Sequence, residues 1–162
     1  MVSLTHMPTI TAIVASPRRP GRFELVVDGK SYVTLSLEVI ERLKLSVGAA
    51  IDEQTAQGIQ QQSATLATYD RALNMLALRA RSAAELKRLL VRKGEPAEQV
   101  DSVIHRLTQA GFLDDSSFAR QFVRTKAFGA GHSRRRLQQE LARRGVVARP
   151  SAKLARKQVR TV

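Results

Sequence analysis

The second half of this sequence contains an internal repeat of helices. The pattern S-x-x-x-L-x-x-x-L-x-x-K/R-G starts at Ser82 and starts again 51 residues later, at Ser133. Each copy places a capping serine before two leucines that share one helix face, and a glycine after the last turn. A fixed-period repeat of this kind predicts units that stack side by side, an architecture that binds long partners more often than it catalyses.

Helices on either side of each copy complete the expected units. Upstream, Tyr69-x-x-x-Leu73 corresponds to Phe118-x-x-x-Phe122 at an offset of 49 residues. Downstream of the first copy, Pro96 opens a third helix with an amphipathic stripe. That stripe consists of Val100, Val103, Ile104 and Leu107. We therefore expect one three-helix repeat over residues 67–113 and a second over 114–162, whose basic C-terminus is irregular or truncated.

The N-terminal part, residues 1–52, is typical of a small β-rich domain. Three β-branched runs fill residues 9–15, 23–27 and 32–35, and Asp28-Gly29 predicts a hairpin turn between the last two. A short helix over residues 37–43 follows, with Ser36 as its N-cap, and residues 47–51 fit a last strand. The Gln/Ala/Thr-rich stretch 53–66 is either a linker or a solvated helix, and a helical linker is favoured. The fold class is α+β, with tandem three-helix repeats after the β-rich domain.

The positive charge is concentrated in the repeats. The chain has 27 Lys and Arg against 14 Asp and Glu, a net charge of +13. Residues 1–60 are balanced, whereas residues 120–162 hold 13 basic side chains and a single acid, Glu140. Such an imbalance is usually kept for a polyanionic partner, because it costs self-repulsion. The alternative is a basic surface that serves only solubility.

Helical geometry indicates which of these charges face outward. In the second repeat, Leu137 and Leu141 define the buried face, and the arginines at 135, 136 and 143 fall opposite. In the first repeat, Arg88 and Arg92 occupy the matching outward positions. We expect a recurring basic stripe that suits a periodic polyanion or an acidic protein groove with a helical repeat. Its candidate residues are Arg88, Arg92, Arg120, Arg124, Lys126, Arg135, Arg136, Arg143 and Arg144.

Candidate catalytic and metal-binding residues are few. There is no cysteine, and the three histidines lack ligand spacing. Asp114-Asp115 precedes a predicted helix and is best explained as capping. The loop at Gly129-Ala130-Gly131 lacks the Gly-Lys-Ser/Thr of a phosphate-binding loop. No secretion signal or membrane span is evident. We expect a cytoplasmic protein that is not an enzyme, with no cofactor, metal site or small-molecule substrate.

Residues 67–147 resemble the RecX family. The resemblance rests on the stretch Ala72–Lys87, on Leu90-x-x-Lys93-Gly94, on the segment from Leu107 through Gly111-Phe112-Leu113-Asp114-Asp115 to Phe118-Ala119, and on the second copy from Gly131 to Gly145. It implies a regulator that lies along the groove of the RecA filament on single-stranded DNA. Such a regulator suppresses ATP turnover, strand exchange and SOS co-protease activity.

The sequence departs from the family pattern in two places. Family members usually carry three three-helix repeats, whereas residues 146–162 lack a clear third-helix stripe. The β-rich N-terminal part also lies outside the family's shared core. Two alternatives stay open. One is a general nucleic-acid-binding or architectural protein. The low aromatic content, 4%, argues against it, because proteins bind single strands by stacking aromatic rings on the bases. The other is an adaptor whose β-rich part docks a different protein.

Overall fold

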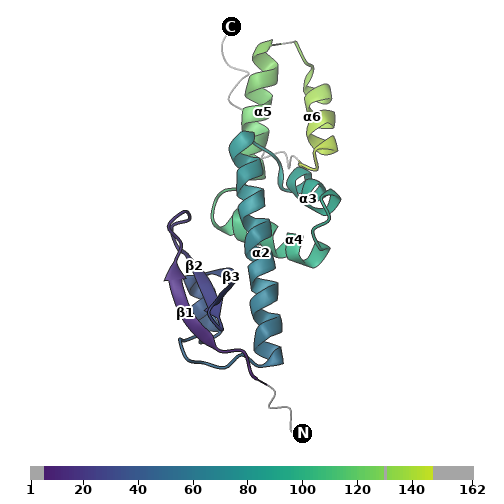
Figure 1. The fold of residues 1–162 in the computed structure, drawn as a ribbon. Helices are drawn as coiled ribbons and strands as arrows, with labels where there is room; N and C mark the ends of the chain where they lie inside the picture. The colour runs from purple at the N-terminus through teal and green to yellow at the C-terminus, as the bar shows by residue number, and fades with distance from the viewer. Residues whose placement is uncertain (1–5, 130, 148–162) are drawn as a thin grey trace. The chain divides into compact units, whose positions relative to one another are not determined.

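The structure is a computed structural model that describes residues 6–129 and 131–147 (Figure 1). The chain forms two compact units, Met1–Arg71 and Ala72–Val162. The boundary between them falls inside one helix, α2 (Glu53–Leu78). Expectations that concern residues 148–162, including the irregular basic C-terminus, lie outside the described residues.

The first unit contains a three-stranded antiparallel sheet in the order β1-β2-β3. The strands are β1 (Ile10–Ala15), β2 (Arg22–Val27) and β3 (Lys30–Ser36). The predicted Asp28-Gly29 turn joins β2 to β3, and both residues have positive φ, 49° and 76°. Two consecutive positive φ values suit the tight turn whose twist matches that of the flanking strands.

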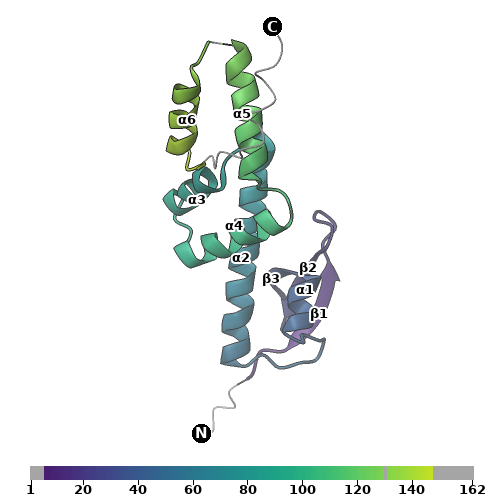
Figure 2. The same ribbon diagram turned by 180° about the vertical axis from the view of Figure 1, so that it is seen from behind.

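Helix α1 (Leu37–Arg42) begins directly at the end of β3, where the Ser36 hydroxyl accepts a hydrogen bond from the N–H of Val39, as predicted. The helix lies against the sheet (Figure 2). The buried core of this unit combines strand residues with the first half of α2. Its fully buried members include Ile10, Leu35 and Ile59.

The expectation of a last strand over residues 47–51 is wrong. Only an isolated bridge joins Ala50 to Thr9. Gly48 has φ of +89°, which takes the backbone out of the extended conformation that a strand needs. Single hydrogen bonds hold the segment instead, such as Gly48 N–H to the Ile10 carbonyl at 2.7 Å.

The stretch 53–66 is helical, and it is continuous with the helix that was expected to begin at Tyr69. Together they form the 26 residues of α2. Asp52 caps its first turn by accepting a hydrogen bond from the N–H of Thr55 at 2.7 Å. Gly58 lowers helix propensity but does not interrupt the helix.

The second unit contains the end of α2 and four further helices. These are α3 (Ala83–Arg92), α4 (Ala97–Gln109), α5 (Asp115–Gly129) and α6 (Arg134–Arg143). Helices α3 and α4 pack through fully buried residues that include Leu86, Leu90 and Val103. Helices α5 and α6 lie side by side (Figures 1 and 2). The fold is thus α+β, a small antiparallel sheet followed by helical repeats.

Candidate functional site

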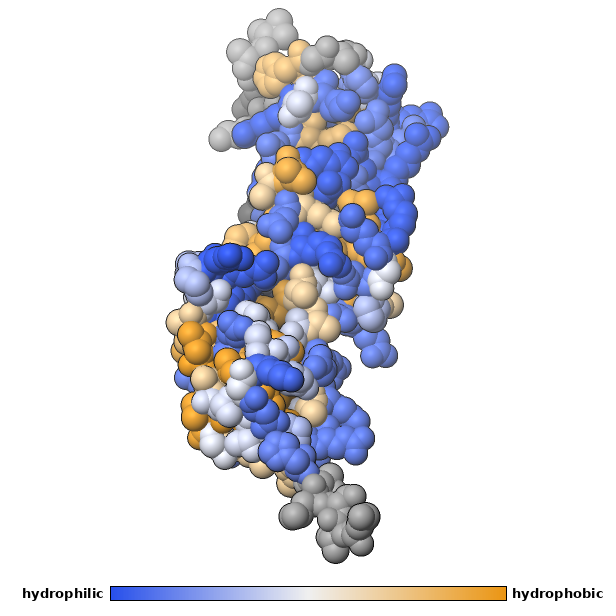
Figure 3. Space-filling model, in the orientation of Figure 1, coloured by the Kyte–Doolittle hydropathy of each residue, from blue (hydrophilic) through white to orange (hydrophobic). Residues whose placement is uncertain are grey.

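Helix α6 carries a shallow hollow lined by arginines. Ser133 caps the helix by accepting a hydrogen bond from the N–H of Arg136, and Leu137 and Leu141 are buried, as predicted. The side of α6 opposite these leucines carries the hollow, which has a volume of about 300 Å³. It is lined by Ser133, Arg135, Arg136, Gln139, Glu140 and Arg143. The side of the helical unit that carries α3 and α6 is predominantly hydrophilic (Figure 3).

The first turn of α6 is unusually basic. It consists of three consecutive arginines, Arg134 to Arg136, and has no acidic residue, whereas each of the other described helices, α1 to α5, has one there. The partial positive charge of a helix N-terminus disfavours cations and favours anions. Glu140, one turn further on, offsets part of this charge, because its carboxylate lies 3.5 Å from Arg136 Nε.

A second arginine-lined hollow lies on α3, the equivalent helix of the first repeat. It has a volume of about 400 Å³. Its lining residues are Arg79, Glu85, Arg88, Leu89 and Arg92. Across the offset of 51 residues, Arg92 corresponds to Arg143, and Glu85 corresponds to Arg136. The two repeats therefore present basic hollows on matching helices, and the second has an arginine where the first has an acid.

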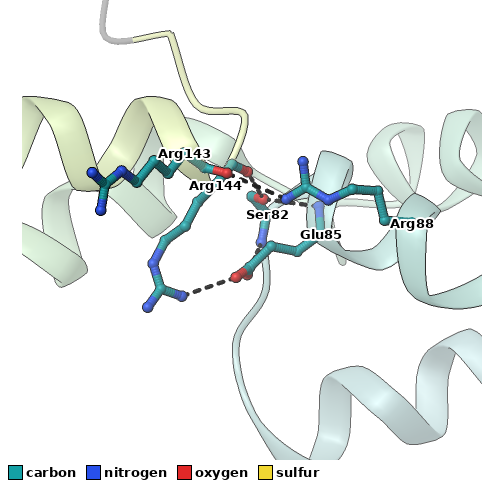
Figure 4. Close-up of polar contacts among 5 residues, drawn as sticks. All are labelled: Ser82, Glu85, Arg88, Arg143 and Arg144. Atoms are coloured by element: carbon teal, nitrogen blue, oxygen red, sulfur yellow. Dashed lines mark hydrogen bonds and ion pairs between the residues drawn. The ribbon is translucent and has the colours of Figure 1, made fainter.

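The C-terminal end of α6 contacts the N-terminal end of α3 (Figure 4). The Ser82 hydroxyl donates to the carbonyl of Arg144 at 2.5 Å. The Arg144 guanidinium pairs with the Glu85 carboxylate at 2.9 Å. Arg88 reaches the carbonyl of Arg143 at 3.5 Å and so connects the two hollows. We call the connected arginines the basic track. They are Arg79, Arg88, Arg92, Arg135, Arg136 and Arg143.

The predicted binding residues divide into two groups. Five of them line the basic track. They are Arg88, Arg92, Arg135, Arg136 and Arg143. The others lie elsewhere: Arg120 donates to the Ser117 hydroxyl at 2.7 Å, Arg124 is exposed on α5, and Lys126 lines a separate hollow. Arg144 is turned inward, with its guanidinium 5.0 Å from the centre of the Phe122 ring as well as paired to Glu85. We therefore assign Arg144 to holding the repeats together.

Sequence reasoning missed Arg79. This residue follows the end of α2 and belongs to no helical stripe, so neither the repeat nor the periodicity singled it out. Its position beside α3 results from the turn into the capping box at Ser82. Burial, and next the like charge of Arg79, lower the pKa of the neighbouring Arg81. Basic groups are thus close together on this turn.

The Asp114-Asp115 pair is engaged in capping, as predicted. Asp114 accepts hydrogen bonds from the N–H groups of Ser116 and Ser117, at 2.9 and 3.0 Å. These bonds, led by that of Ser117, lower the pKa of the Asp114 carboxyl. Asp115 accepts from the N–H of Ala83 at 2.9 Å, at the start of α3. Among the described residues, no group of three potential metal ligands occurs, and no helix is long and apolar enough to cross a membrane.

Comparisons with known proteins match the repeats one by one. Residues 69–107 match the family model of the RecX first three-helix domain, and residues 114–148 match that of the second. The regulatory protein RecX of Mycolicibacterium vanbaalenii is 39% identical over 98 residues, which cover 60% of this chain and 50% of that protein. The RecX protein of Halalkalibacterium halodurans is 31% identical over 144 residues, covering 86% of this chain and 54% of that protein.

The fold agrees with a solved structure as well. A crystal structure of regulatory protein RecX superposes with a TM-score of 0.76 at 24% identity, over 86% of this chain and 68% of that one. The chain spans about half the length of the curated relatives that it matches. Two consecutive domain matches, these relatives and the shared fold lead to one conclusion: the chain belongs to the RecX family.

Proposed function

We propose that this chain is a non-enzymatic regulator that inhibits RecA by binding the RecA–single-stranded-DNA filament through the basic track. The observation that carries the proposal is the pair of arginine-lined hollows on equivalent helices, α3 and α6. They are connected through the contact between Arg88 and the Arg143 carbonyl. A partner with a helical repeat and regularly spaced negative charge matches such a repeated surface.

Both acidic protein surfaces and phosphates suit the chemistry of the track. Arginine donates in a fixed planar fork that fits carboxylates and phosphates. The arginine-rich first turn of α6 adds the helix dipole, which favours an anion at this end. A strand bound here would release counterions, so its affinity would fall steeply with salt.

The experiment that tests the proposal is RecA's DNA-dependent ATPase activity, titrated with this protein at two concentrations of single-stranded DNA. We expect inhibition that persists when DNA is in excess, because the filament is the target. Inhibition that disappears with excess DNA would mean sequestration of DNA, and the general nucleic-acid-binding function would replace this one. Full ATPase activity at saturating protein would contradict both.

Matched variants test whether inhibition of the RecA ATPase depends on the basic track. Arg88→Gln with Arg92→Gln removes two exposed charges from the α3 hollow. Arg18→Gln with Lys30→Gln removes two exposed charges from the β-rich unit. We expect the first pair to raise the concentration needed for half-inhibition and the second to leave it unchanged. If both pairs raised the concentration needed for half-inhibition equally, the track would act only through non-specific charge.

A further inference from the structure

A third hollow, next to the basic track, has a different composition. It has a volume of about 260 Å³, and its lining includes two aromatic rings and three cations beside Ala80, Gln121 and Thr125. The rings belong to Phe118 and Phe122, and the cations to Arg79, Lys126 and Arg144. We call it the aromatic hollow. It is smaller than the roughly 300–1,000 Å³ of a typical small-molecule pocket, so it suits a single ring system rather than a whole cofactor.

The aromatic rings are held in place by their neighbours. Phe118 and Phe122 lie one turn apart on α5, with centroids 6.2 Å apart and planes 22° apart. The Arg144 guanidinium lies over the Phe122 ring at 5.0 Å, and its pairing with Glu85 fixes it there. Both phenylalanines are half-buried, which leaves part of each ring open to the hollow. Rings held in this way offer a stacking surface at low entropic cost.

The aromatic hollow is continuous with the basic track through Arg79. This residue lines both the hollow on α3 and the aromatic hollow. Lys126 adds a further cation beside the rings. Proteins that bind single-stranded nucleic acids combine a cationic groove for the backbone with aromatic rings for the bases. A protein partner would need acidic and apolar groups in the same alternation.

We infer that the aromatic hollow receives one base of a single strand whose phosphates follow the basic track past Arg79. This inference extends the proposed function. It rests on that function in one respect only, namely that the strand bound in the cell is the DNA of the filament. The scarcity of aromatic residues in the sequence is no obstacle, because the fold brings two of the five phenylalanines together beside the arginines.

The test uses the full chain without RecA, and oligothymidylate with one central 2-aminopurine. Stacking on a ring quenches the fluorescence of 2-aminopurine, while anisotropy of an end label reports binding separately. We expect quenching when the protein binds. Phe122→Leu should remove most of the quenching and weaken binding about five-fold or more, since loss of one base–aromatic stack has at least that effect. Binding by the unmodified protein without quenching would overturn the inference.

Two control variants separate the hollow from folding and from charge. Phe128→Leu changes a phenylalanine on the same helix that is 93% exposed and lies outside the hollow, so quenching should stay. Lys126→Gln keeps both rings and should weaken binding while the bound base stays quenched. Loss of quenching in the Phe128 variant but not in the Phe122 variant would contradict the assignment.

A free nucleotide tests whether the hollow binds a base that is part of a strand or a single nucleotide. The monophosphate of 2-aminopurine deoxyriboside should show no quenching at concentrations that saturate the oligonucleotide, because a single phosphate makes few of the track's contacts. Equal binding of the free nucleotide would replace the inference by a nucleotide site. If Phe122→Leu relieved RecA inhibition without changing quenching, the hollow would contact protein instead. Quenching without RecA inhibition would defeat the proposed function and leave this inference standing.

Discussion

The side-chain hydroxyl of Ser82 donates a hydrogen bond of 2.5 Å to the carbonyl of Arg144, 62 residues along the chain. The same oxygen accepts from the N–H of Glu85 at 3.1 Å, so one buried hydroxyl caps α3 and also holds the end of α6. Its equivalent, Ser133, caps α6 and is exposed. The repeat thus uses one serine position both for capping and for the contact between repeats.

Replacing Ser82 with alanine should destabilise the protein more than the same change at Ser133. Loss of a cap costs about 1 kcal/mol, and leaving the partly buried Arg144 carbonyl without its donor adds roughly 1–2 kcal/mol. Ser133→Ala loses the cap alone. Urea denaturation of the two variants measures the difference in the free energy of unfolding. Equal losses would show that the Ser82–Arg144 bond contributes nothing net.

The glycines that end the two middle helices provide a second matched pair. Gly94 and Gly145 both have positive φ, 92° and 77°. A Cβ at position 94 would meet nothing within 4 Å, whereas one at position 145 would come within 2.3 Å of the Ala84 Cβ. Gly94→Ala should cost about 1–2 kcal/mol from backbone strain alone. Gly145→Ala should cost roughly 1–3 kcal/mol more, from overpacking at the contact between the repeats.

A double-mutant cycle tests the cause of that extra cost. Ala84→Gly removes the methyl group that the new Cβ would strike, so the two changes should be less destabilising together than their sum. Thermal or urea unfolding of the four proteins gives the coupling. Additive effects would mean that α6 and α3 separate to relieve the clash.

The sequence was sufficient for the local features of this fold. The capping serines, the buried leucines at 137 and 141, and the Asp28-Gly29 turn all depend on neighbours within four residues, where spacing determines geometry. The 51-residue repeat also placed the outward arginines correctly. The expectation of a strand over residues 47–51 failed because the positive φ of Gly48 depends on tertiary contacts that the local sequence does not show.

The candidate site was only partly predictable, for a related reason. Arg144 belongs to the basic sequence pattern, but its partner Glu85 lies in the other repeat, and no helical periodicity connects residues so far apart. Phe118 and Phe122 have the i, i+4 spacing of helix neighbours, and the sequence showed them only as the counterparts of Tyr69 and Leu73 in the repeat. Their use as one wall of a basic hollow depends on Arg79 and Arg144, which only the packing of the repeats brings there.

The fall in the free energy of unfolding at acidic pH, the acid limb of the stability curve, should depend on Asp114. Hydrogen bonds led by that of the Ser117 N–H hold the pKa of this carboxyl below its ordinary value. The stabilisation is therefore complete above the unfolded-state pKa and is lost as the pH falls through the lowered, folded-state pKa. Asp114→Asn should lower stability at neutral pH and make the acid limb shallower, with the two curves converging at low pH.

A second variant should change the acid limb to an intermediate extent. Ser117→Ala removes the hydroxyl that donates to Asp114 at 2.7 Å but keeps the backbone N–H. Its acid limb should lie between those of the unmodified protein and Asp114→Asn. Unfolding by urea, measured from pH 7 downward, gives all three curves. Parallel curves across this range would show that Asp114 makes no pH-dependent contribution.

The salt dependence of DNA binding counts the phosphate contacts of the basic track. Arg135 and Arg143 are exposed and line the α6 hollow. If each neutralises one phosphate of a single strand, replacing both with glutamine should reduce the slope of log affinity against log salt by about 1.4. Arg18→Gln with Lys30→Gln changes the net charge equally at the β-rich unit and should leave the slope unchanged. Anisotropy titrations with oligothymidylate at four salt concentrations measure both slopes. A similar fall in both would indicate long-range attraction to net charge, and an unchanged slope in the Arg135/Arg143 variant would remove the α6 hollow from the strand's path.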